Sequence, residues 1–348
     1  MELTDAQGIS RKHKRRPTLL DVAQAAGVSR ATASLVVRKS PLVGKNTRDT
    51  VEAAMADLGY VYNLGAARMR ATRSRTVGVV VPNLSNPFFS VLLSGIEEAL
   101  EAAGLSTFFA NSNESADKQD GFVQRMREHG VDGLIICPSI NTPRQLVEDA
   151  LRWDIPLVQT LRKVPETDSD YAGMDVALGM GEAITRLKEL GHTDVGFVTS
   201  PLHHSSRHER INTFKDHMKI AGLNVALIAE VISTHADARK AAGTILQSSP
   251  PPTALICHND VIGLGLHHGF TDLGIIPGQD ISLIGFDNVA ETELVRPALA
   301  SVSTEPFRIG ANAARLLLRR IQDSKAAIHT ESEPTHFVER GSVGPCPV

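Results

Sequence analysis

The sequence is poor in cysteine and has no long apolar run. Its three cysteines, Cys137, Cys257 and Cys346, are far apart and form no C-x-x-C pair, and two of them lie in apolar segments. This usage is typical of reduced, buried thiols in a cytoplasm. No uninterrupted apolar segment approaches the roughly 20 residues that a membrane-spanning helix needs. With 348 residues and 42% hydrophobic content, the chain can bury the cores of two or three domains.

Signals for export and for catalysis are also missing. Residues 1–16 are polar and end in a basic cluster, without the apolar stretch and cleavage site of a leader. The glycines of 263–269 have one residue too many for G-x-G-x-x-G, and no P-loop occurs. His204 and His208 have the spacing of zinc ligands, but the glutamate of a zinc hydrolase is absent between them. We therefore expect a cytoplasmic protein that is not an enzyme and needs no metal or cofactor.

Charge is divided unevenly along the chain. Residues 1–76 hold 14 Lys and Arg against 6 Asp and Glu, whereas residues 77–348 hold 22 against 33, so a segment of charge +8 precedes one of charge −11. A basic head on an acidic body is expected where only the head meets a polyanion such as DNA. The alternative is a solvated basic tail without function.

Residues 18–38 have the pattern of two short helices joined by a tight turn. Thr18 and Asp21 match a capping box that opens the first helix, and Gly27 is suited to end it. Ser29 is suited to begin the second helix. Two short helices in this arrangement predict a helix-turn-helix.

The outward face of the second predicted helix is polar near its N-terminal end, where side chains can reach base edges in a major groove. This face carries Arg30, Ala31, Thr32, Ser34 and Leu35. A third helix is predicted to follow, with Asn46 or Thr47 as its cap. The alternative is a three-helix bundle packed for structure alone, but the basic charge and the polar face favour a DNA-binding domain.

These residues resemble the headpiece of the lactose-repressor (LacI/GalR) family. The run D-V-A-x-x-A-G-V-S-x-x-T-x-S at 21–34 carries the resemblance, and T-R followed by L-G-Y within 47–60 continues it. The resemblance covers roughly residues 17–343 and implies a sequence-specific transcriptional regulator. It divides the chain into a flexible basic arm (1–16), a helix-turn-helix domain (17–62), a hinge helix with linker (63–75) and an effector-binding and dimerisation domain (76–343).

The resemblance also implies the roles of single residues in the head. Positions that grip phosphates or begin helices are matched by Thr18, Ser29, Thr32, Ser34 and Asn46. Arg30 matches a base-reading position and can bind a guanine in bidentate fashion. Ala31 and Leu35 match base-reading positions too, but offer only apolar contact, for instance to a thymine methyl.

Residues 63–70 match the hinge helix, which in this family folds on operator binding and enters the minor groove. Asn63 and Ala66 match the family's pattern there, and Met69 occupies the place of a leucine that wedges into the central base step. Gly65 costs roughly 1 kcal/mol in a helix relative to alanine. We therefore predict a hinge helix that is poorly formed without DNA.

Apolar runs and helical patterns alternate through residues 76–343. Buried strands are predicted at 77–81, 106–110, 133–137 and 155–159, and again at 194–198, 230–233, 253–257 and 281–286. Two such series imply an α/β fold of two parallel-sheet lobes, like that of periplasmic binding proteins. Such sheets bind ligands beyond the carboxyl ends of their strands, so the cleft between the lobes is the expected site.

We expect lobe 1 to span about 76–161 plus 303–322, and lobe 2 about 174–288 plus 336–343. Residues 297–302 are interpreted as a strand that returns to the first lobe, and 336–340 as a closing strand. The chain is then predicted to cross between the lobes near 161–174, 288–303 and 322–336. Hinges of this kind let a bound ligand change the angle between lobes.

The family resemblance places a set of mostly polar residues at the cleft. They are Asn86, Phe88, Phe89, Asn111, Ser139, Arg162, Asp175, Arg210, Asn259 and Asp287. Convergent donors and acceptors suit a hydroxyl-rich ligand, because a buried unpaired hydroxyl is costly. The alternatives are that Asp287 only caps a turn and that Phe88 and Phe89 are core residues. Because Arg162 and Arg210 are both expected to face the cleft, a sugar acid or sugar phosphate is expected as an alternative to a neutral sugar.

The sequence therefore predicts a homodimeric repressor whose affinity for a near-palindromic operator is controlled by a small-molecule effector. Release of the operator is the commoner behaviour in the family. No tetramerising heptad tail follows residue 340, which favours a dimer. One rival is a solute-binding protein of a transport system, which predicts a leader and no basic head. A second is a sugar kinase or isomerase, which predicts a phosphate loop or an acid/base set.

Overall fold

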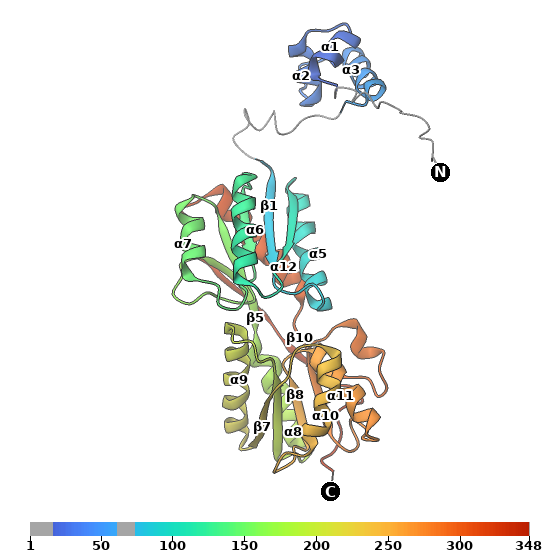
Figure 1. The fold of residues 1–348 in the computed structure, drawn as a ribbon, viewed down its shortest axis with the longest axis vertical. Coiled ribbons are helices and arrows are strands. Elements are labelled where there is room, and N and C mark those ends of the chain that lie inside the picture. The colour runs from blue at the N-terminus through green and yellow to red at the C-terminus, as the bar shows by residue number, and fades with distance from the viewer. Residues whose placement is uncertain (1–16, 61–73, 348) are drawn as a thin grey trace, which may run out of the picture. The chain divides into compact units, whose positions relative to one another are not determined.

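A computed structural model describes residues 17–60 and 74–347 of the chain (Figure 1). The chain forms two compact units, the head (Met1–Thr72) and the body (Arg73–Val348). The predicted basic arm at 1–16 and hinge helix at 63–70 lie outside the described residues. None of the helices in the two described ranges combines the length and the apolar character needed to span a bilayer.

The described part of the head consists of three helices, α1 (Leu19–Ala25), α2 (Arg30–Val37) and α3 (Lys45–Leu58). The predicted capping box is confirmed: Thr18 Oγ1 accepts from the Asp21 amide, and the Asp21 carboxylate accepts from the Thr18 amide. Gly27 has a φ of 65°, which glycine adopts without strain. Ser29 Oγ accepts from the Thr32 amide at 3.1 Å and begins α2, as predicted.

The three helices pack through small and β-branched side chains. The buried residues of this core are Val22, Ala23, Ala26, Ala33, Val36, Val51 and Ala54. The prediction that Asn46 or Thr47 caps α3 is wrong. The helix begins at Lys45, after Gly44, which has an extended backbone and makes no side-chain cap. The buried apolar residues of α3 begin only at Val51, so periodicity did not mark its first turn.

Lobe 1 of the body is built on a six-stranded sheet whose paired strands are parallel, in the order β11-β5-β4-β3-β1-β2. The strands are β1 (Thr76–Val81), β2 (Ser106–Asn111), β3 (Gly133–Ile136), β4 (Leu157–Thr160), β5 (Asp170–Asp175) and β11 (Thr330–Pro334). One face packs against α5 (Pro87–Ala102) and α12 (Pro306–Gln322). The other face packs against α6 (Ala116–Glu128) and α7 (Arg144–Arg152). Covering both faces is what makes the central strands continuous apolar runs.

Lobe 2 repeats this architecture with the order β12-β10-β9-β8-β6-β7 (Figure 1). Its strands are β6 (Asp194–Thr199), β7 (Asn224–Glu230), β8 (Ala254–Cys257), β9 (Ser282–Asp287), β10 (Ala300–Ser303) and β12 (His336–Val338), the last antiparallel to β10. One face packs against α8 (Val176–Glu189) and α9 (Ser205–Ala221), the other against α10 (His235–Leu246) and α11 (Asp260–Asp272). The short helix η1 (Ala290–Glu293) follows β9. Cys137 and Cys257 are free and buried, as predicted.

Two strands of lobe 1 were not predicted, because charged or polar residues limit their apolar runs. They are β5 (D-Y-A-G-M-D) and β11 (T-E-S-E-P), which pair in parallel at one edge of the sheet. Asp170 of β5 is fully buried, and Arg319 and Arg320 bind its carboxylate at 3.0 and 2.8 Å. Charge pairing with α12 therefore allows Asp170, the first residue of this strand, to be buried.

The connections between the lobes differ from the prediction. Ala300 of β10 pairs in parallel with Ile284 of β9, so the prediction that 297–302 returns to the first lobe is wrong. The chain crosses from β5 into α8, from β10 into α12, and from β11 into β12. The first two crossings thus come later than predicted, since β4 and β5 share one sheet and β9 and β10 share the other. The prediction of a strand at 230–233 is wrong, because β7 spans Asn224–Glu230 and ends where that strand was expected to begin.

Candidate functional site

One face of α2 is polar and accessible. Arg30, its first residue, is exposed, as are Ser29 and Ala31, whereas Ser34 and Leu35 are half-buried. Arg30 makes no side-chain hydrogen bond or ion pair with any other described residue of the head. A free guanidinium at the N-terminal end of such a helix is placed to reach a base edge in a major groove.

The other predicted DNA-binding residues are divided between this face, the helix caps and the undescribed segments. Thr32 Oγ1 lies 2.9 Å from Ser29 Oγ, so both hydroxyls stay close to the start of α2. Asn46 is exposed in the first turn of α3, and its carbonyl accepts from Thr50 Oγ1 at 2.9 Å. The hinge residues lie outside the described ranges, namely Asn63, Ala66 and Met69.

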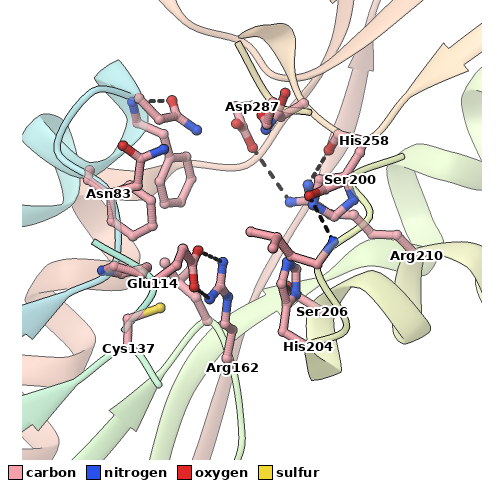
Figure 2. Close-up of a pocket in the computed structure, with 18 of the residues that line it drawn as sticks. Asn83, Glu114, Cys137, Arg162, Ser200, His204, Ser206, Arg210, His258 and Asp287 are labelled. Carbon is pink, nitrogen blue, oxygen red and sulfur yellow. Dashed lines mark hydrogen bonds and ion pairs between the residues drawn. The ribbon is translucent and has the colours of Figure 1, made fainter. Parts of the chain in front are cut away.

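A cavity of about 290 Å³ lies between the two lobes of the body (Figure 2). Its lining comes from the loops after β1, β2, β3 and β4 and from β5 in lobe 1, and from the loops after β6, β7 and β8 and the end of β9 in lobe 2, with residues of α5, α8 and α9. The carboxyl ends of two parallel sheets therefore face one space, as the alternating β-α pattern predicted.

A bidentate ion pair forms part of the lobe 1 wall. Arg162 Nη1 and Nη2 donate to the Glu114 carboxylate at 2.9 and 2.8 Å, and the two side chains are only 11% and 19% exposed. Arg162 Nη1 also donates to the Pro138 carbonyl at 3.1 Å, and the Ile140 amide donates to Glu114 at 3.3 Å. Glu114 thus ties together the loops after β2, β3 and β4, and Arg162 carries no unpaired charge.

Arg210 of α9 forms part of the lobe 2 wall. Its Nη2 lies 3.5 Å from Asp287 Oδ1, its Nη1 donates to the His258 carbonyl, and its guanidinium carbon lies 4.1 Å from the Phe286 ring centroid. Burial raises the pKa of Asp287 to about 7, while Arg210 and a hydrogen bond with Asn86 act in the opposite direction. Asn86 precedes α5 in lobe 1, and its side-chain carbonyl oxygen accepts from the Phe88 amide at 3.0 Å.

Two histidines line the cavity as neutral groups. Burial, reinforced by nearby guanidiniums, lowers the pKa of His204 to about 2, and burial holds the pKa of His258 well below its usual value. His204 Nδ1 accepts from the Arg207 amide at 3.1 Å and so begins α9. Its Nε2 therefore carries the proton and is a hydrogen-bond donor. Across 17–60 and 74–347, no three His, Cys, Asp or Glu side chains are grouped to hold a metal ion.

Comparison with known proteins identifies the family. The model of bacterial regulatory proteins of the lacI family matches residues 18–63, and that of the periplasmic binding protein-like domain matches residues 184–343. The HTH-type transcriptional repressor PurR of Vibrio cholerae is 32% identical over 330 residues, which are 94% of this chain and 98% of the relative. The chain belongs to the lacI family of bacterial regulatory proteins.

Solved structures of lacI-family proteins share the fold. The lac repressor dimer bound to operator and the anti-inducer ONPF aligns with a TM-score of 0.84 at 24% identity, over 94% of this chain and 99% of that one. A lacI-family transcriptional regulator from Enterococcus faecalis V583 with bound ribose aligns with a TM-score of 0.70 at 29% identity, over 78% of this chain and 99% of that one.

Most of the cleft residues predicted for this lacI-family chain line the cavity. They are Asn86, Phe88, Phe89, Arg162, Arg210, Asn259 and Asp287. Phe88 and Phe89 are also buried and meet edge to face with ring centroids 5.5 Å apart, so they serve the core as well as the lining. The Asn259 amide donates to Ser233 Oγ at 2.7 Å, and its carbonyl oxygen caps α11.

Three predicted cleft residues lie outside the lining, because local structure uses their polar groups. Ser139 Oγ lies 2.6 Å from Ser112 Oγ in a buried network. Asp175 Oδ1 accepts from the Ala177 amide at 3.0 Å and begins α8. Asn111 Oδ1 accepts from the Asn113 amide at 3.3 Å in the turn after β2.

The prediction missed several polar lining residues, chief among them Glu114 and His258. His258 directly follows β8, and Glu114 lies in the loop that follows β2. The position of a polar residue just beyond a buried strand was therefore the available signal. The partner of Glu114 is 48 residues away along the chain, so the pairing itself had no local signal.

Proposed function

We propose that this chain is a homodimeric transcriptional repressor that binds a near-palindromic operator through its head and releases it when a sugar-class effector binds in the cleft of its body. One observation carries the proposal: a single chain joins a helix-turn-helix with a free Arg30 guanidinium to a two-lobed body whose interlobe cavity is lined by polar as well as apolar side chains. A regulator of chromosomal DNA works in the cytoplasm, which is where we place it.

Operator recognition rests on α2. Arg30 would contact a guanine through its paired N–H groups, and Ala31 and Leu35 would contact apolar base edges. A two-fold dimer places two such helices on related half-sites, which requires a near-palindrome. The lac repressor structure of the same fold is a dimer on its operator, which supports this arrangement. Asn63, Ala66 and Met69 of the predicted hinge helix would add minor-groove contacts.

Effector control rests on the interlobe cavity. The Enterococcus faecalis regulator with bound ribose supports a sugar-class ligand for the present chain. Neutral imidazoles, amides and paired charges offer the donors and acceptors that sugar hydroxyls need. Because three chain crossings connect the lobes, a ligand that binds both of them changes their relative angle. Effector and operator affinities must then be coupled reciprocally.

A gel-shift experiment with operator DNA selected from a random pool tests the proposal. We expect salt-dependent binding to one near-palindromic sequence, and release by a member of a panel of sugars. Arg210→Gln should keep operator binding but lose the response, because Arg210 lies in the cleft and the head is unchanged. Absence of salt-dependent binding to any duplex would refute the proposed function.

A further inference from the structure

We propose that Glu114 sets the charge specificity of the cleft: by pairing with Arg162 it removes a free positive charge, so that the cleft selects uncharged ligands over anionic ones. This inference rests on the proposed function, since it concerns the effector of the same cavity. It also reverses the expectation that two arginines in the cleft indicate an acidic ligand.

The charges of the cavity lining are balanced and therefore do not favour an anionic ligand. Among the described lining residues, the guanidiniums are Arg162 and Arg210, and the carboxylates are Glu114, Glu209 and Asp287. Glu114 binds Arg162 at 2.8 Å, and Asp287 lies 3.5 Å from Arg210. Even when Asp287 is protonated, the remaining carboxylates balance both guanidiniums. The lining therefore has no net positive charge.

Arg207 and Lys163 lie just outside the lining, and both contact other side chains. Arg207 donates to the Ser200 carbonyl at 2.8 Å and forms an ion pair with Glu230. Lys163 Nζ lies over the Tyr171 ring, 4.1 Å from its centroid. The cavity histidines are uncharged, because burial disfavours their protonated forms and lowers their pKa values. A phosphate group brings about −1.5 to −2 charges and would have to displace Glu114 or be buried unpaired, which is costly.

The backbone holds Glu114 in this position. Asn113 and Glu114 have φ values of 54° and 58°, so two consecutive non-glycine residues adopt the left-handed region. Such strain persists where surrounding contacts over-determine the conformation. The Ile140 amide and the Arg162 guanidinium supply these contacts. The carboxylate is therefore built into the wall rather than left free to turn towards solvent.

Substitution of Glu114 in the full chain, with inorganic phosphate as the probe, tests the proposal. Glu114→Gln keeps the shape but frees the Arg162 charge, whereas Glu114→Asp keeps the carboxylate. Thermal unfolding is followed against phosphate, with sodium chloride at matched ionic strength as the reference. We expect phosphate to give no saturable stabilisation of wild type or of Glu114→Asp. We expect saturable stabilisation of Glu114→Gln, with apparent phosphate binding at least about tenfold tighter than any binding by wild type. Adding Arg162→Met to Glu114→Gln should abolish that gain.

Two results would overturn the inference. One is saturable phosphate binding by wild type that Arg162→Met removes. The other is a folded Glu114→Gln protein that does not respond to phosphate.

If Glu114→Gln fails to fold, calorimetry of wild type with D-ribose and D-ribose 5-phosphate decides. Tighter binding of the phosphorylated sugar overturns the inference. Binding of ribose alone supports it, and so does binding of neither sugar by a phosphate-insensitive wild type. Operator gel shifts on the same preparations keep the two proposals separate, because loss of DNA binding bears on the proposed function and not on the charge of the cleft.

Discussion

A Cβ atom on Gly95 of α5 would lie 2.0 Å from the backbone carbonyl oxygen of Phe307 of α12. Gly310 of α12 meets α5 in the same way, since its Cβ position is 2.1 Å from the Leu92 carbonyl oxygen. The helices cross backbone to backbone, so no side-chain rotation can accommodate an added methyl group. We predict that Gly95→Ala destabilises the body by about 3 kcal/mol, measured by urea unfolding of the full chain.

Gly121→Ala is the matched control for this crossing. Gly121 lies inside α6, where a Cβ would meet only Arg125 Nη1, at 3.4 Å, the end of a flexible side chain. Alanine is more favourable than glycine within a helix by roughly 0.5–1 kcal/mol, so we expect unchanged or increased stability. Equal stability of the two variants would mean that α5 and α12 separate easily, contrary to the close crossing.

Asp170 is the buried anion on which the edge of lobe 1 depends. Its carboxylate accepts from Arg320 Nε at 2.8 Å, Arg319 Nη2 at 3.0 Å and the His329 amide at 2.7 Å. Asp170→Asn leaves Arg320, which is 12% exposed, without its counter-ion. We predict a loss of about 3 kcal/mol in the free energy of unfolding. Asp272→Asn, which breaks an exposed pair with Arg239, should change stability little; equal losses would contradict the importance of burial.

Arg30 is predicted to supply the strongest base-specific contact of the head. Arg30→Ala should remove about 1–3 kcal/mol of discrimination at one base pair of each half-site. Competition gel shifts between the selected operator and single-base variants measure this. Arg38→Ala is the control, because Arg38 Nε donates to the Ser34 carbonyl at 3.1 Å at the other end of the same helix. A uniform loss of affinity for all sequences would instead assign Arg30 to the phosphate backbone.

His204 makes the stability of the body sensitive to acid. Burial and the neighbouring guanidiniums lower its folded-state pKa to about 2, whereas an unfolded histidine titrates near pH ~6.5. As the pH falls below about 6.5, the unfolded state binds a proton that the folded state does not. Stability is therefore lost, by up to about 1.4 kcal/mol per pH unit, until the folded-state pKa is reached.

Buried carboxyl groups act in the opposite direction over part of this range. The pKa values of Asp260 and Asp287 are raised to about 6 and about 7, mainly by burial, so their folded forms bind protons first and gain stability as the pH falls. The difference between His204→Asn and wild type isolates the histidine, since asparagine can still accept the Arg207 amide and cap α9. We predict that the variant loses less stability than wild type between pH ~6.5 and ~5. Parallel profiles would contradict a neutral buried His204.

The sequence by itself determined the features that depend on near neighbours. Thr18 and Ser29 begin helices because their hydroxyls reach amides three residues away. Buried strands such as β1 and β9 were predicted because a sheet covered on both faces needs uninterrupted apolar runs. The cleft followed from the alternation of strands and helices, which places the carboxyl ends of parallel strands at one edge.

Tertiary structure alone decided which polar groups neutralise one another. Arg162 and Glu114 are 48 residues apart in the chain, and Asp170 finds Arg320 across a separation of 150. The first pair removes a free charge from the cleft, and the second allows the first residue of β5 to be buried. Composition and periodicity report the character of a residue and its local geometry, but the energy of a charge depends on the partner that the folded chain brings to it.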